Sequence, residues 1–253
     1  MVLFNNIRKL RFFLLVLMIA VLLLSCTDFF SNSWASWAAR DPDKLVPTVT
    51  AGNVDELIAI SENNTDLSLA VLKKIGNATK GASGDDLLKL QKAALGAATN
   101  AVGLTQAVLS TVKDLGNIDL TDPNETDQVK QIVLDAIGSM KNLDSTSTVL
   151  LAILPVPDDL NNPDSAFNEW ARGAKADDLA MAAVVLIAGD VKDKNIETIE
   201  DIGDYIDGLN SGTSDNAEMA LALALATTLN NRVDELSDSL KNVLNGLNLF
   251  PVV

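Results

Sequence analysis

Segments rich in Ala and Leu, separated by Asn, Asp, Pro and Gly, constrain the fold of this 253-residue chain more than any other feature. Apolar residues within the segments recur at helical spacing, and the residues between them are those that cap or end helices. Runs of aromatic and β-branched residues, which favour strands, are missing. We therefore expect an all-α fold, an irregular multi-helix bundle or short helical array of about nine helices. The expected helices cover residues 28–40, 53–62, 65–79, 83–115, 122–142 and 146–154, a segment from 162 onward, and residues 176–191, 195–209 and 214–247.

Polar residues mark where several of these helices start. Asn53 precedes Glu56 by three residues, which is the spacing of a capping box. Ser83 is expected to cap the longest helix, with acidic residues in its first turn, and Ser214 to cap the last one.

Two stretches are expected to lie in the core. Residues 93–112 carry no charge, so their length alone would allow a membrane span. The stretch is interrupted by Gly96 and Gly103 and by six polar residues, namely Thr99, Asn100, Thr105, Gln106, Ser110 and Thr111. A central helix buried on most sides fits this composition better than a span. Residues 179–187 are apolar all round, and burial is expected there as well.

The first 26 residues predict export and a lipid anchor. Arg8, Lys9 and Arg11 precede an unbroken apolar run at 12–24, and Ser25 and the chain's single cysteine, Cys26, follow it. Charge, apolar core and small residue in this order are typical of a secretory signal peptide, and the run is shorter than the roughly 20 residues of a membrane-spanning helix. We expect cleavage after residue 25 and lipidation of Cys26. Two alternatives stay open: a buried cysteine in an uncleaved membrane anchor, and a chance cysteine near an ordinary cleavage site.

Aromatic residues gather directly after the predicted anchor. Phe30, Trp34 and Trp37 have i, i+4, i+7 spacing, which places them on one face of a short helix. This face either docks on the helical domain or meets the membrane or a partner protein. Residues 26–52 would then form the lipidated N-terminus, aromatic helix and linker, and 53–253 the helical domain, with a candidate subdomain hinge at 155–162.

Composition argues against several classes of function. After removal of residues 1–25 the chain carries 16 Lys and Arg and 34 Asp and Glu, a net charge of −18, which repels nucleic acid. Histidine is absent, so the commonest general base and transition-metal ligand is missing. No serine-nucleophile motif occurs. We therefore expect no catalytic residues, no cofactor and no metal site.

Acidic residues are clustered in two places without the spacing of a known cation site. Five of them between residues 197 and 207 lie on the polar side of an expected helix: Glu197, Glu200, Asp201, Asp204 and Asp207. A solvated helix face is the preferred interpretation, with a weak calcium or magnesium site as the alternative. The acidic residues at 119–127 do not match an EF-hand, and Pro123 indicates a helix start.

The run Leu23-Leu24-Ser25-Cys26 resembles the lipobox of bacterial lipoproteins, in which the cysteine is lipidated and becomes the mature N-terminus. Together with residues 33–42 it looks like envelope lipoproteins of spirochaetes such as treponemes. The helical architecture is also similar to the lipoprotein T component of TRAP transporters, although that family's repeat motifs are absent. The resemblance implies anchoring to the inner or outer membrane through N-terminal acyl chains, facing the periplasm or surface.

The expected function is that of a membrane-anchored envelope lipoprotein with a structural or protein-binding role and an envelope protein as partner. The alternative is an accessory solute- or ligand-binding component of a transporter, which would need an apolar cavity between its helices.

Overall fold

A computed structural model describes residues 41–115, 126–157, 165–198, 200–202, 204–205, 216–238 and 241. The chain divides into two compact units, Met1–Leu45 and Val46–Val253. Within the first unit the structure describes only the short helix α2, Pro42–Leu45, and the residue before it. The second unit contains the remaining described elements.

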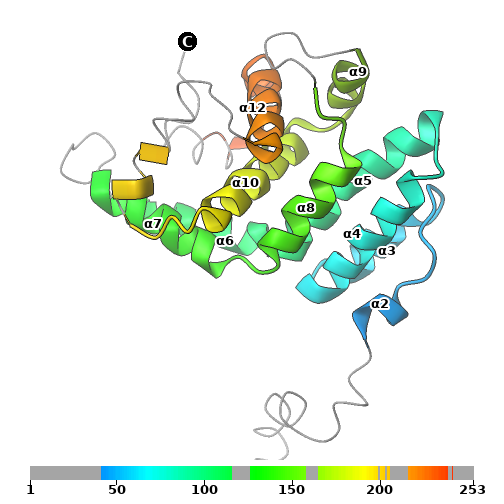
Figure 1. Ribbon diagram of the computed structural model, residues 1–253, viewed down its shortest axis with the longest axis horizontal. Helices are drawn as coiled ribbons and strands as arrows, with labels where there is room; N and C mark the ends of the chain where they lie inside the picture. Colours follow the sequence, from blue (N-terminus) through cyan, green and yellow to red (C-terminus); the bar gives the residue numbers. More distant parts are fainter. Residues whose placement is uncertain are drawn as a thin grey trace, which may run out of the picture. The chain divides into compact units, whose positions relative to one another are not determined.

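The described residues are helical and contain no strand, which confirms the all-α fold class (Figure 1). The helices of the second unit are α3 Val54–Ser61, α4 Thr65–Thr79, α5 Gly84–Val102, α6 Leu104–Leu115, α7 Thr126–Ser139, α8 Leu143–Ile153, α9 Ser165–Gly173, α10 Ala176–Asp193 and α12 Ala217–Asn230, followed by the short 3₁₀ helix η3, Val233–Glu235. No described helix has the length and apolarity required to cross a membrane.

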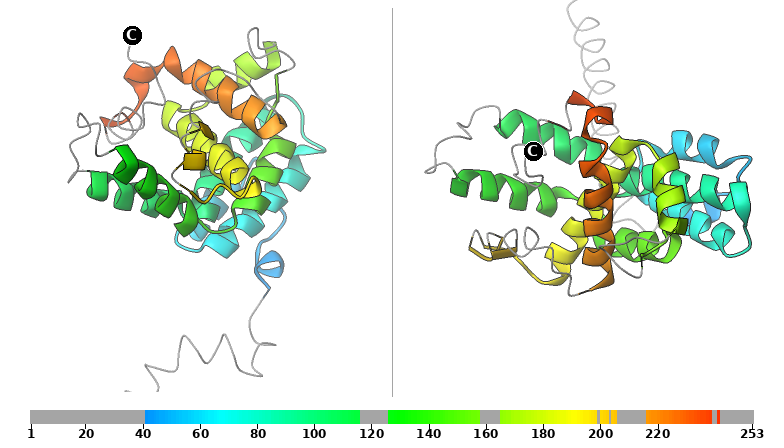
Figure 2. Two further views of the ribbon diagram at one scale, coloured as in Figure 1. Left: turned by 60° about the vertical axis from the view of Figure 1, so that its left-hand side comes forward. Right: turned by 90° about the horizontal axis from the view of Figure 1, so that it is seen from above.

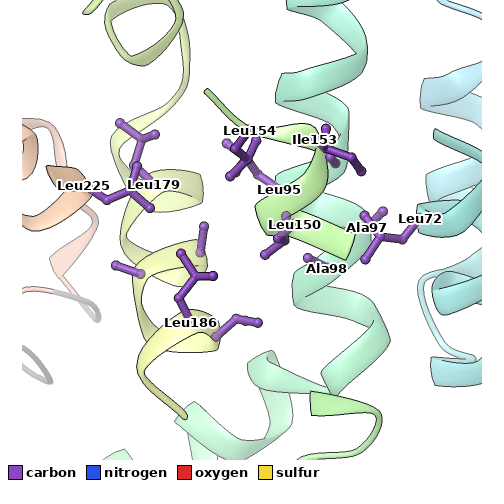
Figure 3. Packing of buried hydrophobic residues seen from close by; sticks show 14 of the residues in the cluster. Leu72, Leu95, Ala97, Ala98, Leu150, Ile153, Leu154, Leu179, Leu186 and Leu225 are labelled. Carbon is purple, nitrogen blue, oxygen red and sulfur yellow. The ribbon is translucent and has the colours of Figure 1, made fainter. Parts of the chain in front are cut away.

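Helix α5 is the centre of the core, as expected for the first part of 83–115. It contacts α3, α4, α8 and α10, and α10 in turn packs against α8 and α12. Leu95, Ala97 and Ala98 of α5 have no exposed surface. Figure 3 shows Ala97 between Leu150 of α8 and Leu72 of α4. The Ala residues let the neighbouring helices approach α5 closely, because a methyl group takes little space.

The prediction of one helix over 83–115 is wrong. Gly103 has a φ of 68°, in the left-handed region, and separates α5 from α6. This conformation suits glycine, which has no Cβ to clash, and it is the usual end of a helix. Helix α6 then packs against α7 (Figure 2).

The end of α5 is held by the segment that joins α7 to α8. The backbone N–H of Lys141 donates to the Val102 carbonyl at 3.1 Å, and the Asn142 amide donates to the Ala101 carbonyl at 3.2 Å. These bonds satisfy carbonyls that a helix end leaves without intrahelical partners. Asn142 itself has a φ of 53°, which Asn tolerates better than most residues.

The prediction of one long final helix over 214–247 is also wrong. Helix α12 begins after Asn216, whose side chain accepts a hydrogen bond from the Met219 N–H at 2.8 Å, and it ends at Asn230. The chain then turns into η3, where Arg232 contacts another helix through its guanidinium group. Apolar periodicity alone did not indicate this turn, because the residues after it keep helix-forming composition.

Two predicted caps differ in detail. The Asn53 side chain accepts the Thr50 N–H at 2.8 Å, outside α3, so the capping box with Glu56 does not form. Ser83 precedes α5 but makes no side-chain cap bond. Both helices still start where the sequence placed them, because their buried faces set the position and the caps add only about 1 kcal/mol each.

The burial expected at 179–187 is confirmed. Leu179, Val185 and Leu186 have no exposed surface, and Met181, Val184 and Ile187 are partly buried. In the acidic segment, Glu197, Glu200, Asp201 and Asp204 are exposed, in line with a solvated face, while Asp207 lies outside the described residues. The candidate hinge at 155–162 is described only as far as Pro157.

Candidate functional site

The residues predicted to mediate anchoring and binding lie outside the described part of the chain. Cys26, Phe30, Trp34 and Trp37 all precede residue 41. Their roles therefore stay predictions, and the structure brings none of them to another site.

A surface hollow of about 550 Å³ lies between α3, α5 and the start of α10. We call it the α3–α5–α10 hollow. Its apolar wall comes from Ile58, Leu88, Ala93 and Gly96. Its charged residues are Asp55 from α3, Asp85, Lys89 and Lys92 from α5, and Lys175 and Asp178 at the start of α10.

The helices place these charges by register. Asp85, Lys89, Lys92 and Gly96 follow one another at i, i+4, i+7 and i+11, so they share one face of α5. Lys175 occupies the N-cap position of α10, and its side chain makes no capping hydrogen bond. The packing of α10 on α5 brings the two groups of charges to the same hollow.

One ion pair forms within the hollow. The Lys89 ammonium lies 2.9 Å from the Asp55 carboxylate and links α5 to α3. Both side chains are largely exposed, so the pair adds at most about 1 kcal/mol to stability. Among the described residues, Lys92, Lys175, Asp85 and Asp178 have no partner of opposite charge within 4.0 Å. The hollow thus keeps two cations and two anions that the fold does not pair.

Asp178 is the most perturbed of these groups. Burial raises the pKa of its carboxyl group, the Lys175 charge lowers it in part, and the neighbouring Asp177 raises it further. A nearby cation that does not form a close ion pair leaves this carboxylate incompletely compensated.

Lys92 lies against the end of α9. A Cβ atom placed on Gly173 would stand 2.5 Å from its Nζ atom, so the lysine head lies close against the backbone of Gly173. The carboxyl end of a helix carries partial negative charge, which favours an ammonium group there. The Lys92 head therefore lies beside the end of α9, at the rim of the hollow.

A second cation closes the same helix end. Arg232 donates to the carbonyls of Ala171 at 2.8 Å and Ala174 at 3.0 Å, and its Nη2 lies 2.6 Å from Glu235. The arginine side chain is 17% exposed. It ties the segment after α12 to α9, and the Ser237 N–H, which donates to Asp177 at 2.9 Å, ties the same segment to the start of α10.

A buried carboxylate joins α10 to the segments that follow it. Asp190 is 1% exposed and accepts hydrogen bonds from the Tyr205 hydroxyl at 2.8 Å and from the Asn216 amide. The Lys194 ammonium lies 3.1 Å from the same carboxylate and 5.4 Å from the centre of the Tyr205 ring. These contacts join α10 to Tyr205 and to the residue that caps α12.

Carboxylates do not assemble into a metal site in the part of the chain that the structure describes. No group of three or more Asp, Glu, His or Cys residues is arranged there to hold an ion. The arrangement of the α3–α5–α10 hollow suits reversible binding through charge and apolar contact.

Sequence reasoning missed this hollow. The spacing of Asp85, Lys89 and Lys92 was a usable signal for the α5 face, but it did not reveal which helices would face it. Comparison with protein-family models, curated proteins and solved structures found no match.

Proposed function

We propose that this protein is a lipid-anchored envelope protein of spirochaete type whose helical domain has a structural or protein-binding role. The observation that carries the proposal is the single cysteine, Cys26, placed directly after a basic and apolar leader. Acyl chains on Cys26 would hold the domain at the inner or outer membrane, facing the periplasm or surface. The net charge of −18 after cleavage supports contact with proteins over contact with nucleic acid.

The anchor is tested by replacing Cys26 with Ala and following incorporation of labelled palmitate and distribution between membrane and soluble fractions. We expect the label to be lost, and the protein either to leave the membrane fraction or to stay uncleaved. Thr27→Ala, a change next to the cysteine, is the matched control and should keep both the label and the membrane location. An unmodified Cys26 in the mature protein, seen by mass spectrometry, would contradict the proposal.

The aromatic face of Phe30, Trp34 and Trp37 is proposed to dock on the helical domain close to the anchor. Trp170 has no exposed surface and must be replaced by Phe, so that emission comes from the other two tryptophans alone. Blue-shifted emission from the lipid-free monomer supports docking. Water-exposed emission would favour contact with the membrane or a partner.

An accessory ligand-binding component of a transporter is the second candidate. The α3–α5–α10 hollow favours it, because its volume of about 550 Å³ suits a small solute. The hollow is open and carries charged residues, whereas this function was expected to need an apolar cavity between the helices. A solute for this hollow must therefore be polar.

We infer no catalytic role. The absence of histidine and of a serine-nucleophile motif supports this reading. A turnover assay that detects hydrolysis by the purified protein would overturn it.

A further inference from the structure

We propose that the α3–α5–α10 hollow binds a small zwitterion, a molecule with an ammonium group, a carboxylate and an apolar part, such as a free amino acid or a short peptide. The site is built entirely from residues of the second unit. It goes beyond the anchoring role and stands whether or not Cys26 is acylated.

The balance of unpaired charges selects this class of ligand. Lys92 and Lys175 would attract a carboxylate, while Asp85 and Asp178 would attract an ammonium group. A simple anion would meet two carboxylates, and a simple cation two ammonium groups, so each gains little net attraction. A molecule with both charges can place its carboxylate near the two lysines and its ammonium group near the two aspartates.

The walls and the volume of the hollow limit the size of the ligand. Ile58, Leu88 and Ala93 offer apolar surface beside the charges, and Gly96 leaves room for a side chain of the ligand. A volume of about 550 Å³ lies within the usual range for small-molecule sites, roughly 300–1,000 Å³. It is large enough for one amino acid or a short peptide.

Of the four unpaired groups, Asp85 and Lys175 are exposed, and Lys92 and Asp178 are partly buried. Lys89 already supplies the ion pair between α5 and α3. Lys92 lies beside the end of α9 and has no ion-pair partner within the described part of the chain. Burial raises the pKa of Asp178, so a bound ammonium group would relieve a carboxylate that the fold leaves partly uncompensated.

Calorimetric titration of the full-length chain, purified in mild detergent, tests the proposal. The zwitterionic probes are alanine, leucine and phenylalanine and their homodipeptides. Comparing the two sets shows whether the hollow prefers a free amino acid or a peptide. N-acetyl-leucine keeps only the carboxylate and leucinamide only the ammonium group. We expect at least one zwitterion to bind with a dissociation constant in the micromolar to millimolar range. Both singly charged analogues should bind at least about tenfold more weakly.

Single substitutions then assign the binding to this hollow. Lys92→Met and Lys175→Met should each weaken binding of the zwitterion by about tenfold. Asp178→Asn should weaken binding of the zwitterion and strengthen binding of N-acetyl-leucine. Lys73→Met, at an exposed lysine of α4 outside the hollow, is the matched control and should change nothing. Circular dichroism checks that each variant is folded.

Three results would overturn the proposal: no binding of any of the six zwitterions at millimolar concentration, equal binding of the singly charged analogues, or equal loss of binding in Lys73→Met.

Discussion

Leu95 has no exposed surface and lies in the cluster that joins α5 to its neighbours (Figure 3). Leu95→Asp would bury a carboxylate without a partner in that cluster, and the side chain would lose its packing. We expect the free energy of unfolding to fall by at least about 3 kcal/mol, measured by urea denaturation with circular dichroism.

The matched control for Leu95→Asp is Ile60→Asp, the same type of change at a side chain that is 65% exposed. It should shift the free energy of unfolding by no more than about 0.5 kcal/mol. Near-native stability of Leu95→Asp would mean that α5 is not buried.

Arg232 stabilises the end of α9 through two carbonyls that belong to buried residues, Ala171 and Ala174. Arg232→Met keeps the apolar stem and removes both donors, so the two carbonyls lose charge-assisted hydrogen bonds. We expect a loss of about 2–3 kcal/mol in the free energy of unfolding. Glu235→Gln removes only the exposed partner of Arg232 and should have a far smaller effect. Equal losses in the two variants would show that the ion pair, and not the helix end, carries the effect.

At the scale of elements, the break between α5 and α6 depends on one residue. Gly103→Ala would place a side chain at a φ of 68°, while the nearest atom to its Cβ, Thr65 Cγ2, lies at an ordinary 3.6 Å. The cost is therefore backbone strain, and we expect about 1–2 kcal/mol of destabilisation. The measurement is the urea midpoint of the variant.

Gly138→Ala is the matched control for this break. Gly138 lies within α7 and a Cβ there would meet no atom within 4 Å. Alanine is the better helix former, so this change should stabilise the protein by up to about 1 kcal/mol. A stabilising Gly103→Ala would contradict the account of the break.

Helix positions were predictable where local signals and packing agree. Residues 65–79 were expected as a helix and form α4, because Asn64 caps it and its apolar face meets α5. The ends of the helices expected over 83–115 and 214–247 could not be predicted in this way. Gly103 and Asn231 end α5 and α12 where the composition still favours a helix. Glycine inside an apolar run is compatible with both outcomes, and tertiary packing decides between them.

The hollow shows a similar division between local and tertiary information. The α5 face with Asp85, Lys89 and Lys92 follows from helical spacing alone. The contributions of Asp55 and Lys175 depend on how α3 and α10 pack on α5, and a single sequence does not contain that geometry in readable form. The predicted anchor is the reverse case, because the motif that predicts it is local and can be read without any tertiary structure.

At the scale of the whole molecule, the chain carries a formal net charge of −15, and carboxylates meet where α8, α10 and α12 pack together. Glu218 of α12 is half-buried at this junction. Burial raises the pKa of Glu218, a hydrogen bond from Ser147 lowers it in part, and the charges of Asp193, Asp190 and Asp144 raise it further. Two lysines offset the cluster through ion pairs, Lys192 with Asp144 at 3.3 Å and Lys194 with Asp190 at 3.1 Å.

Glu218→Gln is therefore expected to stabilise the protein at neutral pH. Because the pKa of Glu218 is higher in the folded than in the unfolded chain, the ionised carboxylate opposes folding at any pH above the raised value. That cost shrinks as the pH falls through the raised pKa and is gone below the ordinary value of 4.5, where both states are protonated. Gln keeps an oxygen that can accept the Ser147 hydroxyl, so the substitution removes the charge alone.

The melting temperature of Glu218→Gln should thus exceed that of the unaltered protein at neutral pH, and the two should converge in acid. Glu197→Gln, at an exposed glutamate away from this junction, controls for the general loss of one negative charge and should show a smaller difference. If Glu218→Gln lowered the melting temperature at neutral pH, ionised Glu218 would be a favourable partner of the lysines, and the junction of α8, α10 and α12 would be held by charge attraction instead of by its apolar core.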